Sequence, residues 1–517
     1  MTLNLGLRWD ASINFLPAQL RDTATTSNRT INILRQIVAA NPSSAAAADG
    51  LNRAKSIASN IDDLTKTTAD WKEFQPRVGF AWDPTGAGKW VIRGGYGIAR
   101  DQVFQNLTLF SLQQANETLY QQAIDLVNNG RPGACSSTNF LCTFRFGTGP
   151  GTDPLPSSAF SPANIAPGAF GRINDPKMTD PWSQQASIGA AWQFHPDYAF
   201  SVDYYHVLGT HEPRVLNINP TLAFVCKSGF PTSNPSDPRC VRGANTRFFD
   251  AAFVAAGIEP LGGIVLPDGS KVGRLEQINL IGTNNRSRFD SVNFVLRKRF
   301  SHNYSFQASY VLSRSQSWGG RATASYSGNA VAITPERQFL GGEFGPTGFD
   351  ERHRVVLSGI FQLPYGFEIS PILQASSARP FPFRTGADND GDGRKNLDRA
   401  CVGTTPSSPI SQITANGCQE VPINTLRGDP FVQMDVRFGK AFKFRSERMA
   451  LRLYWEIYNL FNRQNFGNNF QDKATAANFL KPLGYAGGPG PSDSAARGFG
   501  AGVSGPLRSQ FGFRFEF

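Results

Sequence analysis

One acidic stretch of the sequence, Asp388-Asn389-Asp390-Gly391-Asp392-Gly393, has residue types and a spacing that could bind a metal ion. Carboxylates at every second position resemble the first half of an EF-hand loop, where side-chain oxygens converge on Ca²⁺. The twelfth position holds Arg399 in place of the bidentate Glu that completes such a loop. The stretch predicts either a Ca²⁺ site with Asp388, Asp390 and Asp392 as ligands or a solvated acidic turn.

The six cysteines fall into three pairs that are close in sequence, each in a stretch rich in Gly, Pro and Ser. The pairs are Cys135 with Cys142, Cys226 with Cys240, and Cys401 with Cys418. None of them shows the paired C-x-x-C spacing of a zinc site. An even number in local pairs predicts disulfides that close loops, formed in an oxidising compartment; six free thiols in a reducing cytosol are the alternative.

Other signals of chemistry are missing from the sequence. It contains no P-loop, no H-E-x-x-H, no G-x-S-x-G and no dinucleotide fingerprint, and its five histidines show no ligand spacing. The net charge is +11, but the Lys and Arg residues are scattered and no nucleic-acid-reading motif organises them. We therefore expect neither an enzyme nor a nucleic-acid-binding protein. The positive charge suits an anionic partner such as lipopolysaccharide.

The C-terminal stretch 506–517 alternates between two kinds of side chain. Because successive strand residues point to opposite faces, one face is apolar and the other polar. The apolar face consists of Phe511, Phe513, Phe515 and Phe517. Either a bilayer or a second sheet must cover these rings. A last strand that ends on Phe resembles the closing strand of outer-membrane β-barrels, which the barrel-insertion machinery reads as a signal.

The same alternation recurs along the chain and predicts twelve strands of about 9 to 15 residues, long enough to cross a bilayer. Connections alternate between about 3 to 5 residues and about 30 to 80 residues. Pro371 lies within one of these strands, where it removes a ladder donor. The predicted strands are 1–10, 75–83, 90–100, 182–194, 198–210, 286–300, 304–316, 351–363, 367–377, 430–442, 448–460 and 506–517.

This alternation of short and long connections predicts an all-β fold, an antiparallel up-and-down transmembrane β-barrel in the outer membrane. Short turns would lie in the periplasm, and long loops with all six cysteines outside. No apolar run approaches the roughly 20 residues of a membrane-spanning helix. A watery lumen requires polar residues on the second face, and the candidates are Gln193, Asp203, Asn293, Arg297, Gln307, Asp435, Arg437, Arg452 and Glu456. A soluble secreted β-rich binding protein is an alternative.

Five segments of the sequence resemble the C-terminal barrel of Oar-like TonB-dependent receptors, which usually carry a carboxypeptidase-regulatory-like domain in front. The segment near the terminal strand is the most specific of them. The segments are Phe74-Gln75-Pro76-Arg77-Val78-Gly79-Phe80-Ala81-Trp82-Asp83, Ile92-Arg93-Gly94-Gly95-Tyr96-Gly97, Ala308-Ser309-Tyr310-Val311-Leu312-Ser313-Arg314-Ser315, Phe349-Asp350-Glu351-Arg352-His353-Arg354 and Glu456-Ile457-Tyr458-Asn459-Leu460-Phe461-Asn462-Arg463.

The resemblance implies a 22-stranded barrel with an N-terminal plug that imports a bulky substrate with energy delivered through TonB. The sequence shows about twelve strands and no signal peptide, TonB-contacting box or plug. We therefore expect residues 1–517 to be the C-terminal portion of such a barrel, with TonB reached only through the missing plug. A self-closed twelve-stranded barrel is the structural alternative. A surface adhesin or passive pore with disulfide-stapled loops is the functional one.

Overall fold

The structure is a computed structural model of the 517-residue chain. It describes residues 1–12, 70–101, 172–175, 178–221, 279–319, 343–386, 398–404, 418–444, 449–484 and 506–516. Shorter pieces are described at 42–43, 264–265 and 271–272, with single residues at 48, 52, 224 and 247.

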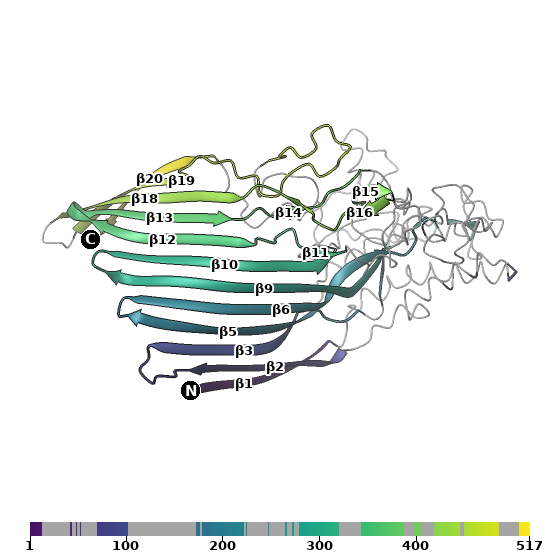
Figure 1. Cartoon of the computed structure of the whole chain (residues 1–517), viewed down its shortest axis with the longest axis horizontal. Helices are drawn as coiled ribbons and strands as arrows, with labels where there is room; N and C mark the ends of the chain where they lie inside the picture. Colours follow the sequence, from purple (N-terminus) through teal and green to yellow (C-terminus); the bar gives the residue numbers. More distant parts are fainter. Residues whose placement is uncertain are drawn as a thin grey trace, which may run out of the picture.

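Twelve long strands form one continuous antiparallel sheet, in which each strand pairs with the long strand that precedes it in the chain (Figure 1). This confirms the expected number and order of strands. The strands are β1 (Thr2–Ser12), β2 (Asp70–Trp82), β3 (Trp90–Arg100), β5 (Trp182–His195), β6 (Tyr198–Asn217), β9 (Asn279–Ser301), β10 (Tyr304–Trp318), β12 (His353–Leu363), β13 (Phe367–Ser376), β18 (Phe431–Phe444), β19 (Met449–Tyr458) and β20 (Arg508–Glu516).

Eight short strands accompany the long ones. β4 (Arg172–Asn174) runs parallel to β9, and β11 (Phe344–Pro346) pairs with β10, so both extend the main sheet. The others form three two-stranded sheets: β7 (Ile264–Val265) with β8 (Lys271–Val272), β14 (Pro380–Phe381) with β17 (Leu426–Arg427), and β15 (Cys401–Thr404) with β16 (Cys418–Glu420). The sequence alternation did not predict any of these eight strands, since each is too short to show a period.

Short turns join the strands at one end of the sheet, which we call the turn rim; the opposite end, where the long connections begin, is the loop rim. In Figure 1 the turn rim is on the left. The β9–β10 turn is a two-residue turn in which His302 and Asn303 have φ of 52° and 70°, the backbone that the right-handed strand twist favours in hairpins. At the β2–β3 turn, the Asp83 carboxylate accepts backbone hydrogen bonds from Thr85 and Gly88 at 3.0 and 2.6 Å.

Two strands are longer than the sequence pattern predicts. β6 continues past Thr210 to Asn217, and β9 begins at Asn279, before the expected Arg286. These extensions pair with each other, with register shifts between Thr210 and Arg214. Their neighbouring apolar residues are buried together instead of alternating, and they include Val215, Leu216, Leu280 and Ile281. A strand that buries both of its faces loses the two-residue period by which strands are predicted.

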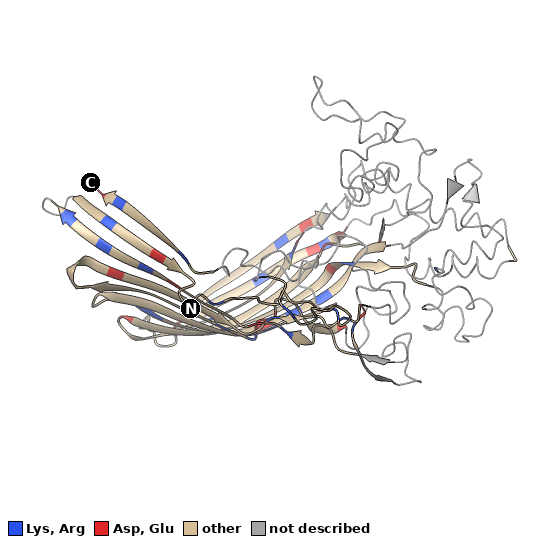
Figure 2. Ribbon diagram, turned by 90° about the horizontal axis from the view of Figure 1, so that it is seen from above, with Lys and Arg blue, Asp and Glu red and all other residues tan. Residues whose placement is uncertain are grey.

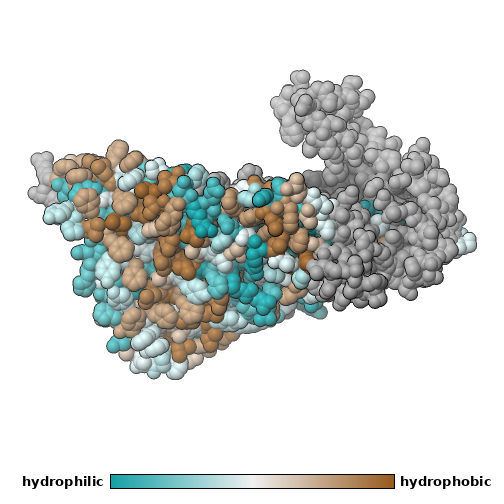
Figure 3. All heavy atoms as spheres, turned by 45° about the horizontal axis from the view of Figure 1, so that its top comes forward, coloured by the Kyte–Doolittle hydropathy of each residue, from teal (hydrophilic) through white to brown (hydrophobic). Residues whose placement is uncertain are grey.

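The main sheet has two faces, which we call the apolar face and the polar face after the side chains that they carry. On the apolar face, Phe438, Trp455 and Phe511 lie opposite one another on β18, β19 and β20. Their neighbouring ring centroids are 5.6 and 5.8 Å apart. Phe511 and Phe513 are each 78% exposed, so protein does not cover them. Figure 3 shows apolar side chains over the strand region. These exposed rings are what the membrane interpretation predicts and a two-sheet sandwich does not.

The apolar side chains form a band between two polar levels. On β9 the band contains Val292, Phe294 and Leu296, with Asp290 on the loop-rim side and Lys298 on the turn-rim side. Asp290 and Lys298 are roughly 26 Å apart along the strand, which compares with an apolar band about 25 Å tall in transmembrane barrels. The Lys298 ammonium lies 3.7 Å from the Tyr304 ring centroid and donates to the Ser301 carbonyl at 2.8 Å.

The sheet is bent, and the strands near the C-terminus rise away from the rest when seen from above (Figure 2). β1 and β20 are the two ends of the strand order, and no hydrogen-bonded pairing joins them within the described ranges. Among the described residues, none of the helical segments combines the length and the apolar character needed to cross a bilayer.

Candidate functional site

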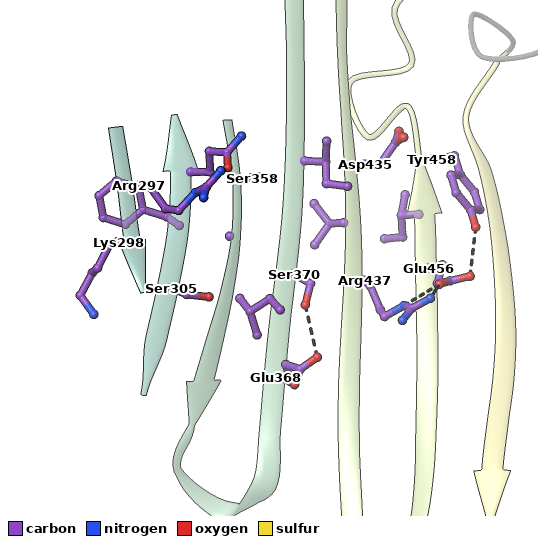
Figure 4. A pocket seen from close by; sticks show the side chains of 17 residues that line it. Arg297, Lys298, Ser305, Ser358, Glu368, Ser370, Asp435, Arg437, Glu456 and Tyr458 are labelled. Atoms are coloured by element: carbon purple, nitrogen blue, oxygen red, sulfur yellow. Dashed lines mark hydrogen bonds and ion pairs between the residues drawn. The ribbon is translucent and has the colours of Figure 1, made fainter. Parts of the chain in front are cut away.

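A groove of about 730 Å³ lies on the polar face, in the C-terminal half of the sheet. Six neighbouring strands, from β9 to β19, contribute to its lining (Figure 4). Register explains why these side chains meet. Arg297, Gln307 and Ser358 lie opposite one another on β9, β10 and β12. Residues that lie opposite in register share a face, and so do side chains two residues apart along a strand. Each such row therefore adds polar groups to the same wall.

The centre of one wall is the ion pair between Arg437 of β18 and Glu456 of β19, which lie opposite each other in register. The Arg437 Nε donates to Glu456 Oε1 at 2.5 Å. Glu456 Oε2 also accepts the Tyr458 hydroxyl at 3.0 Å and the Gln510 side-chain amide. The Arg437 guanidinium lies 5.1 Å from the Tyr454 ring centroid. Glu456 thus connects β18, β19 and β20 through side chains as well as through the ladder.

The other side of the groove is less tightly connected. Arg297 donates from Nε to Gln307 at 3.1 Å, and the Ser370 hydroxyl donates to Glu368 at 3.3 Å. In Figure 4, Lys298 points away from the other labelled side chains, because it belongs to the apolar face near the turn rim. The groove therefore offers guanidinium, carboxylate and hydroxyl groups together. This arrangement can bind a polar ligand of mixed charge through hydrogen bonds.

Five of the nine polar-face residues predicted from the sequence line the groove, namely Arg297, Gln307, Asp435, Arg437 and Glu456. The sequence analysis missed Ser358, Glu368, Ser370 and Tyr458. The alternation along β19 places Tyr458 on the same face as Glu456, two residues away, whereas Ser370 is brought to this wall by lying opposite Arg437. The register between β13 and β18 was the missing information.

The segment 349–354, one of the family-like motifs, ties loop-rim segments to the sheet. Asp350 is buried; it accepts the Ser315 backbone amide at 2.8 Å and an Arg427 guanidinium at 3.3 Å. Glu351 accepts hydrogen bonds from Arg354 at 2.9 Å and from Arg379 at 2.7 Å. The two acidic residues thus fasten β10 and β12 to segments near 379 and 427.

The motif 456–463 forms the turn that ends β19. Asn459 is 1% exposed and has a φ of 53°, and its backbone amide donates to Asp435 Oδ1 at 2.8 Å. Its side chain donates to the Arg463 carbonyl at 2.9 Å and accepts the Arg463 amide at 3.1 Å. Asn tolerates this left-handed backbone better than most residues, so the motif is explained by local structure.

The predicted calcium ligands Asp388, Asp390 and Asp392 lie outside the described residues. Arg399, at the twelfth position of that loop, is described: it is buried and donates from Nη1 to Glu343 at 2.8 Å. In the described part of the chain, no group of three or more His, Cys, Asp or Glu residues is arranged to hold a metal ion. The calcium site stays a prediction.

The structure leaves the disulfides and the insertion signal as predictions. Cys135, Cys142, Cys226 and Cys240 fall outside the described residues. Cys401 and Cys418 lie on the paired strands β15 and β16, where Cys401 faces Glu420 and Cys418 faces Thr404 in the backbone register. Of the terminal aromatic residues, Phe511, Phe513 and Phe515 lie on β20, and Phe517 is not described.

Similar solved structures include three outer-membrane proteins. The outer membrane transporter YddB from Escherichia coli has 11% identity and a TM-score of 0.41, with 75% of this chain and 37% of that chain covered. The ferric-catecholate import receptor Fiu from E. coli K12 has 9% identity and a TM-score of 0.35, covering 87% and 35%. The siderophore receptor PiuA from Acinetobacter baumannii has 9% and 0.36, covering 86% and 36%. This chain thus spans little more than a third of their length.

No curated protein matches the sequence. A protein-family comparison, however, matches residues 1–481 to the family described as outer membrane beta barrel domain. The match covers all the long strands except β20. Together with the exposed apolar band, it excludes the soluble secreted alternative. The chain belongs to the outer membrane beta barrel domain family and is a protein of the outer membrane.

Proposed function

We propose that this chain is the barrel portion of a TonB-dependent receptor that takes up a bulky polar substrate across the outer membrane. The observation that supports this proposal most directly is the groove of about 730 Å³ on the polar face. Its lining combines Arg297 and Arg437 with Glu368, Asp435 and Glu456. A wall of both charges and several hydroxyl groups can bind and release a polar substrate repeatedly without holding it tightly.

In this proposal the turn rim faces the periplasm and the loop rim faces outward. Short turns on one side and long loops on the other are typical of outer-membrane barrels. The aromatic residues near the turn rim support a membrane interface at this end of the strands, because rings with an apolar body and a polar edge favour such interfaces. Trp90 and Trp192 lie there with stacked rings whose centroids are 5.1 Å apart.

TonB, an N-terminal plug and the Oar-like subtype are further parts of the proposal. They rest on the sequence motifs at 74–83, 92–97, 308–315, 349–354 and 456–463. We also propose that β20 carries the signal for barrel insertion, that the three cysteine pairs form disulfides, and that the stretch 388–393 binds Ca²⁺ or remains a solvated turn. The proposed role is transport, without enzymatic activity.

A direct test compares cells with and without TonB that express this barrel portion joined to the proposed N-terminal plug. We would measure accumulation of a panel of labelled polar compounds, such as oligopeptides, oligosaccharides and metal chelates, before and after a protonophore. A receptor accumulates at least one of them only when TonB and the proton gradient are present. Uptake that persists without TonB would instead support the passive pore. Surface binding without uptake would support the adhesin.

A matched pair of variants connects uptake to the groove. Arg437→Ala leaves Glu456 without its guanidinium partner and should lower uptake about tenfold, because this half-exposed charge pair orders the wall that a substrate would contact. Arg514→Gln is the control, since Arg514 also belongs to the polar face but lies outside the groove. Equal uptake by both variants would remove the groove from the transport path.

A further inference from the structure

Four polar side chains form a cluster on the apolar face, where neighbouring positions are hydrophobic. Asp290 of β9 is its centre. Asp290 Oδ1 accepts the Tyr204 hydroxyl at 2.7 Å and lies 2.6 Å from the Nδ1 of His206. Asp290 Oδ2 accepts the Arg288 Nε at 2.7 Å. Side chains with this many charges do not belong inside a hydrocarbon layer.

Asp290 and His206 of this cluster lie in one register row that crosses five strands, with Tyr204 one row toward the turn rim and Arg288 one row toward the loop rim. Tyr96, Ala186, His206, Asp290 and Arg314 are successive partners on β3, β5, β6, β9 and β10. The next two rows toward the turn rim place Val292 and Phe294 on β9, and they are mostly apolar. The row therefore marks the level at which the apolar band ends on the loop-rim side.

The charges at this level of the apolar face do not balance. Asp290 provides one carboxylate, whereas Arg288 and Arg314 provide two guanidinium groups on the same face. Arg288 uses its Nε for Asp290, and its side chain is 52% exposed. Arg314 lies opposite Asp290 in register and has no hydrogen bond or ion pair within the described part of the chain. The outward surface at this level is cationic, with at least one guanidinium available to a ligand.

We propose that Arg288 and Arg314 bind the phosphate group of an outer-membrane lipid. A guanidinium presents paired N–H donors in a fixed plane that matches phosphate oxygens, and its charge complements an anionic headgroup. The position also fits, because a lipid whose acyl chains lie along Val292 and Phe294 has its headgroup at the level of Asp290. Asp290 holds Arg288 in place and is itself fixed by the Tyr204 hydroxyl, which lowers the entropy lost on binding. This inference is independent of the transport role.

The test uses the full chain purified in detergent micelles and titrated with lipid A that carries both phosphates. Binding is followed by native mass spectrometry. The double variant Arg288→Gln with Arg314→Gln should bind this lipid about tenfold more weakly than the wild type. Dephosphorylated lipid A should bind both proteins weakly and equally. The double variant with Lys at both positions should retain most of the affinity, because it keeps the charge.

Two controls separate the proposal from its alternatives. Arg514→Gln removes an exposed guanidinium from the polar face and should leave lipid binding unchanged. Arg314→Gln alone removes no contact within the described residues, so it tests the site even if the double variant folds poorly. Equal affinity of wild type and Arg314→Gln for lipid A would overturn the role of Arg314. Displacement of the lipid by equimolar inorganic phosphate would overturn the lipid as the ligand.

Discussion

Arg93 of β3 and Asp203 of β6 form a two-hydrogen-bond ion pair across the strand that lies between them. The Nε and Nη2 of Arg93 donate to the two Asp203 oxygens at 2.9 and 2.8 Å. The residue between them on β5 is Gly189, which lies opposite both in register. A Cβ at Gly189 would lie 2.1 Å from Asp203 Oδ1. The absence of a side chain at Gly189 is therefore what allows the pair to form.

We expect Gly189→Ala to destabilise the sheet by about 1–3 kcal/mol, because the new methyl group must displace the Asp203 carboxylate. The measurement is the thermal midpoint of heat-modifiable gel mobility in detergent. Gly512→Ala, on the same face of β20, is the matched control, since its added Cβ has nothing within 4 Å. Equal midpoints for the two variants would show that the Arg93–Asp203 pair tolerates the methyl group.

A second prediction concerns pH and the turn between β5 and β6. Hydrogen bonds from Ser301 and Arg299 lower the pKa of Asp197 to about 2, from an ordinary value near 3.8. A lowered pKa in the folded state stabilises the protein above the unfolded-state pKa, and this contribution is lost as the pH falls through the folded-state value. Asp197→Asn should therefore melt below the wild type at pH 7, and the gap should close between about pH 4 and pH 2. A gap that does not change with pH would contradict the role of the Asp197 charge.

The turn after β19 gives a third prediction. Asn459→Ala removes two side-chain hydrogen bonds and keeps a β-carbon at a φ of 53°, so we expect a loss of about 2–3 kcal/mol. Asn459→Gly removes the same hydrogen bonds but suits a positive φ, and it should recover about 1 kcal/mol of that loss. Chemical unfolding in urea measures both values. If Gly were no better than Ala, backbone strain would not matter at this turn.

The cysteines give a fourth prediction. If the three local pairs form disulfides, the native protein should contain no thiol that reacts with a maleimide until it is reduced, and reduction should expose all six. Peptide mapping by mass spectrometry then reads the connectivity. A Cys401–Cys418 bridge would link β15 to β16, whose backbones are already paired. Thiols that react before reduction would contradict the prediction.

The sequence was most informative where a strand borders both water and an apolar medium. β3 begins at Trp90 and ends at Arg100, the bounds that alternation and turn residues predict. β13 continues through Pro371, which lies opposite Val436. The extension of β9 toward Asn279 was not predicted, because both of its faces are buried and the two-residue period disappears.

The groove was only half predictable for a different reason. The two-residue alternation along each strand assigns Arg437 and Glu456 to the polar face from the sequence alone. Which residues oppose them depends on register, and a tight turn fixes register only between the two strands that it joins. β13 and β18 are separated by residues 377–430, so no local rule predicts that Ser370 lies opposite Arg437.

The paired extension of β6 and β9 has a consequence for how the cell surface presents this protein. From the level of Asp290, β9 continues to Asn279, a further distance of roughly 36 Å along the strand. In the proposed orientation, with the loop rim outward, this arm of β6 and β9, which β4 joins at its tip, carries ordered backbone well beyond the lipid headgroups. Asn217, Asn279 and Ile281 are 0% exposed, so the tip of the arm is covered by protein. Antibodies and phage tail fibres would therefore meet the segments around the arm and not its strands.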